Sequence, residues 1–262
     1  MAGREECGRA GECHKTGGRA RSAHSGVDDR APRLGRVVPS GQCRGGLGLG
    51  GALVIVRVIT SDTCIREGAE HLARIEPRFA AIIPDLQPLP LRLKPDGFAA
   101  LLGAIVSQQV SVASANAIMG RLVAAGMDDP RAIALASAED LRALGLSAQK
   151  ARYAKALALA DLDYPGLHAL PNDAVIAQLT QVTGIGVWTA EIYAMFSLGR
   201  ADVFAPGDLA LQEAARVIFD LPDRPRDTAL RAMAQAWAPW RSVAARVMWA
   251  YYAIIKDREG IR

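Results

Sequence analysis

The sequence predicts an all-α protein with two helical lobes and a cleft between them, preceded by an extension without fixed structure. Three observations support this prediction. Apolar residues recur at helical spacing almost everywhere after Ser61, no convincing pair of strands follows Arg57, and hydrophobic residues make up 50% of the 262-residue chain. Such a composition can fill a core of helices. Residues 61–262 are therefore expected to form one helical domain.

The expected helices begin at capping residues and end where proline, glycine or a loss of apolar periodicity interrupts them. Ser61 and Asp62 favour a first helix that runs to about Phe79, and Asp96 favours a second helix through Val106. The remaining expected helices span residues 111–125, 130–136, 138–144, 148–159, 171–179, 187–198, 208–219, 227–236 and 241–256.

Residues 1–60 differ in composition from the rest of the chain. They contain 13 of the 25 glycines, 10 of the 31 basic residues and no aromatic residue. Such a segment buries too little apolar surface to offset the entropy lost on ordering, so we expect it to be disordered. Two interpretations remain open for it, a basic arm that stays close to DNA and a dispensable extension.

The formal net charge of +4 does not by itself indicate a nucleic-acid partner. Residues 61–262 contain 21 basic and 22 acidic residues, so the excess of positive charge lies in the extension. Any basic surface on the helical domain must be local. No apolar run approaches the length that crosses a bilayer, and we expect no membrane span.

The four cysteines, Cys7, Cys13, Cys43 and Cys64, all lie in the first quarter of the chain without the close spacing of a metal site. The histidines are scattered as well, so no zinc site is expected. A disulfide framework is not expected in a chain of this size with a full core, which fits a reducing cytoplasm.

The most informative motif is the run from Thr183 to Ala190, with the sequence TGIGVWTA. Gly184 and Gly186 lack a Cβ, and this allows the backbone to approach a partner closely between two helices. The N–H groups at the start of the second helix favour an anion such as a phosphate. A carboxylate, Asp208, follows about twenty residues later after a Pro-Gly pair.

Four segments together resemble the helix-hairpin-helix DNA glycosylases, the HhH-GPD superfamily, and within it the bacterial DNA-3-methyladenine glycosylase II branch. They are residues 105–111 (IVSQQVS), 183–190 (TGIGVWTA), 202–208 (DVFAPGD) and 237–242 (WAPWRS), in the order in which the family carries them. The resemblance covers roughly residues 95–255 and places the helix-hairpin-helix at about 179–198. Relatives often carry an extra N-terminal α+β domain, for which this chain has no room before Ser61.

The resemblance implies that Asp208 is the catalytic residue. Cleavage of an N-glycosidic bond builds positive charge on the sugar, which a buried carboxylate stabilises while it orients or deprotonates a water molecule. Pro-Gly-Asp before an apolar run is also a helix cap, and both roles can coexist. Family members that also cut the strand carry a lysine where this chain has Trp188, which implies a monofunctional enzyme that leaves an abasic site.

The resemblance further implies that Trp188 and Trp249 wall a base pocket. Alkylated purines such as 3-methyladenine and 7-methylguanine are cationic, so electron-rich rings attract them. Other aromatic residues near Trp249, such as Trp237 and Trp240, are expected in the core because they recur at helical spacing.

Contacts with DNA are expected from the hairpin and from the glutamine pair. The backbone of Gly184, Ile185 and Gly186 would hold phosphates, and Thr189 could cap the following helix. Gln108 and Gln109 either fill the gap left by a flipped nucleotide or make capping and interhelix hydrogen bonds. For two cations, Lys150 and Arg241, a solvated surface charge is favoured over a phosphate contact.

Relatives often bind a monovalent cation through hairpin carbonyls, here those of Thr180, Val182 and Ile185, so sodium or potassium is the only cofactor considered. No iron-sulfur cluster is expected, because no cysteine follows Asp208. The expected enzyme is a cytoplasmic, nucleoid-associated bacterial monomer that acts on double-stranded DNA with alkylated bases. The alternatives are a non-catalytic helix-hairpin-helix module, and the same fold with uracil, hypoxanthine or oxidised-base specificity.

Overall fold

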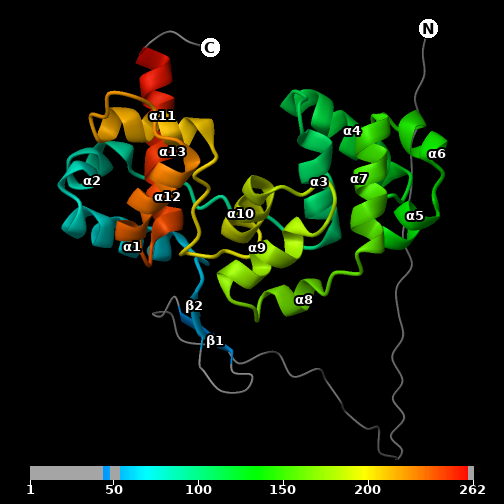
Figure 1. Cartoon of the computed structure of the whole chain (residues 1–262), viewed down its shortest axis with the longest axis horizontal. Coiled ribbons are helices and arrows are strands. Elements are labelled where there is room, and N and C mark those ends of the chain that lie inside the picture. Colours follow the sequence, from blue (N-terminus) through cyan, green and yellow to red (C-terminus); the bar gives the residue numbers. More distant parts are fainter. Residues whose placement is uncertain (1–43, 48–53, 259–262) are drawn as a thin grey trace, which may run out of the picture. The chain divides into compact units, whose positions relative to one another are not determined.

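The computed structural model describes residues 44–47 and 54–258 (Figure 1). Helices dominate this part of the chain, so the predicted all-α class is confirmed for it. The helices are α1 (Asp62–Ile75), α2 (Pro77–Ile82), η1 (Ile83–Leu86), α3 (Phe98–Ser107), α4 (Val112–Ala124), α5 (Pro130–Leu135), α6 (Ala138–Ala143), α7 (Ala148–Leu159), α8 (Tyr164–Leu167), α9 (Asn172–Thr180), α10 (Val187–Phe196), α11 (Leu209–Ile218), α12 (Asp227–Ala234), η2 (Gln235–Trp237) and α13 (Arg241–Arg258).

The helices pack in two groups, which correspond to the two predicted lobes. In one group α13 packs against α1 and α11, and in the other α7 packs against α3, α5 and α6. Between them α10 packs against α9 and also contacts α3 (Figure 1). Buried side chains of both groups belong to one hydrophobic core, and the described residues fall within one compact unit. The helix-hairpin-helix therefore lies where the two groups meet.

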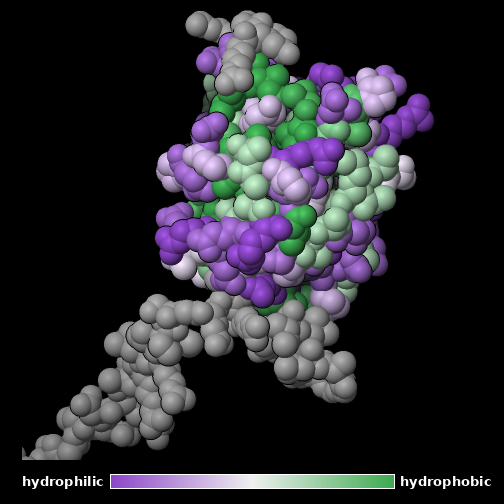
Figure 2. Space-filling model, turned by 90° about the vertical axis from the view of Figure 1, so that its left-hand side faces the viewer, coloured by the Kyte–Doolittle hydropathy of each residue, from purple (hydrophilic) through white to green (hydrophobic). Residues whose placement is uncertain are grey.

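An aromatic cluster fills the core beneath α13. The ring centroid of Trp237 lies 5.3 Å from that of Phe79, 5.4 Å from that of Phe204 and 5.7 Å from that of Phe219. Trp237 and Trp240 are each 2% exposed, which confirms that both belong to the core. On the outer face drawn in Figure 2, hydrophilic residues are interspersed with hydrophobic ones.

The prediction of disorder for residues 1–60 is wrong for the segments that the structure describes. Strand β1 (Arg44–Leu47) pairs antiparallel with β2 (Val54–Arg57), and Val58 forms a bridge with Arg200. The backbone N–H of Ile59 donates to the Gly199 carbonyl at 2.7 Å, and Ile59 is 1% exposed. The helical domain therefore begins before residue 61. Residues 1–43 and 48–53, on which the rest of the prediction falls, lie outside the described residues.

Two predicted helix limits are also wrong. The first helix ends at Ile75 rather than near Phe79, because Glu76 precedes Pro77 and is extended, with φ −133° and ψ 107°. Asp96 does not cap α3, whose N-cap is Gly97. The carboxylate of Asp96 instead lies 2.5 Å from Nε2 of His168. The one-turn helix α8 was not predicted.

Among the described residues, no helix is long and apolar enough to cross a membrane, and no group of three or more His, Cys, Asp or Glu side chains is placed to hold a metal ion. Cys64, whose side chain is buried in α1, is disulfide-bonded, although no disulfide framework was expected from the sequence.

Candidate nucleic-acid site

The hairpin between α9 and α10 uses its two glycines differently. Gly184 has a φ of +100°, and a Cβ at this position would lie 2.4 Å from Cγ of Tyr153. Gly186 is the N-cap of α10 with a φ of −84°, and a Cβ there would meet nothing within 4 Å. Gly184 is therefore required by the turn itself, whereas Gly186 leaves open space at the start of α10, where backbone N–H groups are unpaired.

The hairpin is tied to the end of α3 by the first residue of the glutamine pair. Nε2 of Gln108 donates to the Gly184 carbonyl at 3.0 Å, so Gln108 makes the interhelix hydrogen bond that was one of its two expected roles. Gln109 is exposed, with a φ of +56°. The structure thus separates the two glutamines into one that braces the hairpin and one that stands at the surface beside it.

Thr189 does not have the role expected for it. Gly186 is the N-cap of α10, and Thr189 lies in the third position of the helix with 7% of its surface exposed. Thr189 lines a cavity between α3, α4 and α10. The predicted cap is therefore wrong, because the N-cap of α10 lies three residues before Thr189, whereas the DNA contact stays a prediction.

Two basic side chains that were predicted as surface charges each form hydrogen bonds with other residues of the protein. Arg241 donates from Nε and Nη2 to the carboxylate of Asp202, at 2.7 and 2.9 Å. Nζ of Lys150 donates to the Val106 carbonyl at 2.7 Å, near the end of α3. Desolvation by burial lowers the pKa of Lys150 below its ordinary value. Both side chains are partly exposed and each contacts a partner within the protein, so neither is simply a solvated charge.

Asp208 lies at the N-terminus of α11 and is held by four hydrogen-bond donors. Its Oδ1 accepts the backbone N–H groups of Ala210 and Leu211, at 3.0 and 3.1 Å. Nε1 of Trp249 also donates to Oδ1 at 3.2 Å, and Nε1 of Trp188 donates to Oδ2 at 3.1 Å. The structure thus brings together the three side chains predicted for the site. Asp208 is half-buried, not buried as expected, and Trp188 is 46% exposed.

A cavity of about 460 Å³ lies between α3, α4 and α10, and neither Asp208 nor the two tryptophans predicted to wall a base pocket belong to its lining. Its wall includes Tyr193 and Phe196 of α10, and the Phe196 ring lies 5.7 Å from that of Trp249. Desolvation by burial raises the pKa of Tyr193 to about 12, and its hydroxyl accepts the Gly97 N–H. Most of the exposed lining is apolar, and its polar side chains are those of Lys94, Asp96, Ser107, Asn116, Thr189, Tyr193 and Ser197. The cavity therefore offers mainly apolar contacts to an occupant.

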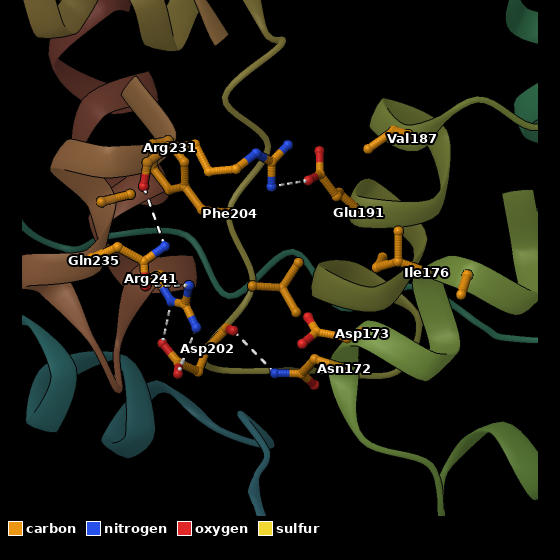
Figure 3. Close-up of a pocket in the computed structure, with 13 residues that line it drawn as sticks. Asn172, Asp173, Ile176, Val187, Glu191, Asp202, Phe204, Arg231, Gln235 and Arg241 are labelled. Atoms are coloured by element: carbon orange, nitrogen blue, oxygen red, sulfur yellow. Dashed lines mark hydrogen bonds and ion pairs between the residues drawn. The ribbon is translucent and has the colours of Figure 1, made fainter. Parts of the chain in front are cut away.

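A second cavity, of about 310 Å³, lies on the opposite face of α10 and was not predicted (Figure 3). Its lining includes Val187 and Glu191, whereas Thr189 and Tyr193 line the first cavity. At 100° per residue these two pairs point to opposite sides of the helix. Oε1 of Glu191 lies 2.9 Å from Nη1 of Arg231. Burial nevertheless raises the pKa of Glu191 to about 7.

The family is decided by comparison with known proteins. Residues 102–242 match the model of the HhH-GPD superfamily of base excision DNA repair proteins. The chain belongs to the HhH-GPD superfamily. The matched region of this HhH-GPD protein contains the glutamine pair, the hairpin and Asp208, whereas Trp249 follows it.

Named relatives of this HhH-GPD protein are 3-methyladenine DNA glycosylases. DNA-3-methyladenine glycosylase 1 of Schizosaccharomyces pombe is 30% identical over 201 residues, which cover 71% of this chain and 87% of the relative. DNA-3-methyladenine glycosylase 2 of Escherichia coli is 32% identical over 168 residues, covering 59% of this chain and 57% of that protein.

Solved structures agree with these relatives. The Schizosaccharomyces pombe 3-methyladenine DNA glycosylase in complex with abasic DNA has a TM-score of 0.60 at 29% identity, and the match covers 70% of this chain and 95% of that one. A DNA-3-methyladenine glycosidase from Bacillus halodurans has a TM-score of 0.58 at 35% identity, covering 63% and 79%. The predicted superfamily is thereby confirmed.

Proposed function

We propose that this protein is a monofunctional DNA N-glycosylase that removes alkylated bases, of the 3-methyladenine and 7-methylguanine type, from duplex DNA and so begins base excision repair. The observation that carries the proposal is the carboxylate of Asp208, held by the indoles of Trp188 and Trp249, of which Trp249 packs against Phe196 in the wall of a largely apolar cavity. The relatives named as 3-methyladenine glycosylases and the neighbour bound to abasic DNA support it.

The site suits a reaction that separates a cationic sugar from a leaving base. The nucleotide first leaves the stack, at a cost of a few kcal/mol that damage reduces. A flat base then has a cavity of about 460 Å³, within the usual range of small-ligand pockets. As the glycosidic bond breaks, the carboxylate of Asp208 stabilises positive charge on the sugar and orients or deprotonates the water that attacks it.

Water, rather than an amine of this protein, is the proposed nucleophile. A strand-cutting mechanism needs an amine that attacks the sugar and forms a Schiff base. Trp188, whose indole touches the carboxylate, cannot provide one. Treatment of the enzyme and damaged DNA with borohydride should therefore give no covalent adduct, and a trapped adduct on this chain would refute the monofunctional mechanism.

The test of the function is direct. The full chain is incubated with duplexes that contain 3-methyladenine, 7-methylguanine, uracil, hypoxanthine or 8-oxoguanine, and the released base is identified. We expect release of the alkylated purines, and a loss on the order of 100-fold or more for Asp208→Asn, which keeps most of the capping. Duplex binding without release of any base would support a non-catalytic module instead.

We also propose a monomeric cytoplasmic enzyme whose hairpin carbonyls, at Thr180, Val182 and Ile185, bind sodium or potassium. The Val182 carbonyl accepts the Ile185 N–H at 3.0 Å, so the hairpin turn brings these two residues together. Duplex affinity measured in potassium chloride and in tetramethylammonium chloride at equal concentration tests the cation, since equal affinities would exclude it.

A further inference from the structure

The hydrogen bonds to Asp208 are distributed unequally between its two oxygens. Oδ1 accepts three donors, the N–H groups of Ala210 and Leu211 and Nε1 of Trp249. Among the contacts of the described residues, Oδ2 accepts only Nε1 of Trp188. A carboxylate offers about four lone-pair directions over its two oxygens. Oδ1 is therefore fully occupied, and Oδ2 keeps a direction for a further contact.

The two indole donors come from different helices and are fixed to different degrees. Trp188 lies in the first turn of α10, whereas Trp249 lies within α13, 41 residues beyond Asp208. Trp249 is half-buried, and its ring packs against Phe196. Trp188 is partly exposed, and its N–H donates to Asp208. An indole N–H can only donate, so neither tryptophan can take a proton from the site.

We propose that Trp188 and Trp249 are positioning residues that orient the Asp208 carboxylate through their N–H groups, a role separate from contact between their aromatic faces and a base. The inference rests on the proposed function and deepens it. Oδ1 accepts hydrogen bonds from α11 and Trp249, so Oδ2 is the oxygen that faces the anomeric carbon and the attacking water. A carboxylate aimed before the substrate arrives needs no reorganisation as charge develops on the sugar.

A replacement that removes the N–H and keeps the ring separates this role from stacking. β-(3-Benzothienyl)alanine has the bicyclic ring of tryptophan with sulfur in place of the N–H, and can be placed at position 188 or 249 by codon suppression. Hydrogen bonds to charged groups predict a rate of base release reduced roughly 10- to 100-fold in single turnovers. Duplex affinity should change less than about 2-fold. The same replacement at Trp240, which lies in the core, is the matched control.

Coupling to Asp208 decides whether the two indoles act through it. In an Asp208→Asn background, the benzothienyl replacements should reduce the residual rate by less than about 3-fold, because the carboxylate they orient is gone. Full, additive losses in that background would overturn the inference, because the N–H groups would then act independently of Asp208. Wild-type rates for both replacements in the unmodified chain would overturn it as well.

A second readout does not depend on catalysis. The chain has four tryptophans and therefore four indole N–H resonances when labelled with ¹⁵N. Asp208→Asn should shift the resonances of Trp188 and Trp249 upfield and leave those of Trp237 and Trp240 in place. Unmoved resonances for both would overturn the inference. Because this spectrum is recorded without DNA, it tests the hydrogen bonds even if no base is released, an outcome that would instead contradict the proposed function.

Discussion

Replacement of the two hairpin glycines by alanine should affect different properties of the protein, its stability at Gly184 and its DNA affinity at Gly186. In Gly184→Ala, the new Cβ would lie 2.4 Å from Tyr153 Cγ while φ is +100°. Left-handed strain of about 1–2 kcal/mol adds to overpacking of about 1–3 kcal/mol, so the free energy of unfolding should fall by roughly 2–5 kcal/mol. In Gly186→Ala the Cβ enters open space, and the stability loss should stay below about 1 kcal/mol.

Duplex affinity should show the reverse preference. If phosphates contact the backbone at the start of α10, the methyl group of Gly186→Ala displaces them, and loss of hydrogen bonds to a charged group weakens binding roughly 10- to 100-fold. Urea unfolding gives the stabilities, and fluorescence anisotropy with a labelled abasic-analogue duplex at fixed salt gives the affinities. Tyr153→Gly should relieve the clash in Gly184→Ala and leave the strain from the positive φ, whereas Tyr153→Ala keeps a Cβ that would lie 2.6 Å from the new one. A Gly186→Ala variant that binds DNA as wild type would refute the phosphate contact.

Three further predictions follow from side chains with internal partners. The pKa of Glu191 is raised to about 7 from an ordinary 4.5. Between these pH values the folded state therefore binds more protons than the unfolded state. The free energy of unfolding should fall by up to about 3 kcal/mol as pH rises through that window. Glu191→Gln should flatten this dependence in urea unfolding measured from pH 4.5 to 8, and an unchanged slope would contradict it. Gln108→Ala removes the hydrogen bond to the Gly184 carbonyl and should cost about 1 kcal/mol of stability while weakening duplex affinity; unchanged affinity would show that the brace is dispensable. Arg241→Met should lower the free energy of unfolding by about 1–3 kcal/mol, because Asp202 loses both donors. The salt dependence of DNA binding should stay unchanged. A shallower dependence would indicate that Arg241 contacts a phosphate after all.

Helices whose limits depend on local chemistry could be predicted from the sequence. Ser111 and Ser147 cap α4 and α7 by accepting an N–H three residues later, and α7 spans 148–159 as expected. What the sequence could not provide were pairings between distant segments. The segment around Ile59 is ordered because the Ile59 N–H donates to the Gly199 carbonyl. The composition of the first sixty residues gives no sign of this partner.

The same limit applies to the site. The spacing of the motif, with the resemblance, identified Asp208 and both indoles. Three hydrogen bonds join residues that are 76, 44 and 39 positions apart in the sequence. They are those of Gln108 with Gly184, of Lys150 with Val106 and of Arg241 with Asp202. A surface-exposed cation and one that braces a helix look alike in sequence, because the difference lies in which carbonyl or carboxylate the fold brings near.

The cap and the chemistry proposed for Asp208 are compatible because a carboxylate has two oxygens. Capping of α11 uses Oδ1, which accepts the N–H groups of Ala210 and Leu211. Serine or threonine would cap this helix equally well, but each has a single side-chain oxygen, and capping would occupy it. Aspartate supplies a charged second oxygen that the helix does not need. The helix start therefore fixes the direction of the carboxylate, and Trp188, at the mouth of the hairpin, donates to the oxygen left for the reaction.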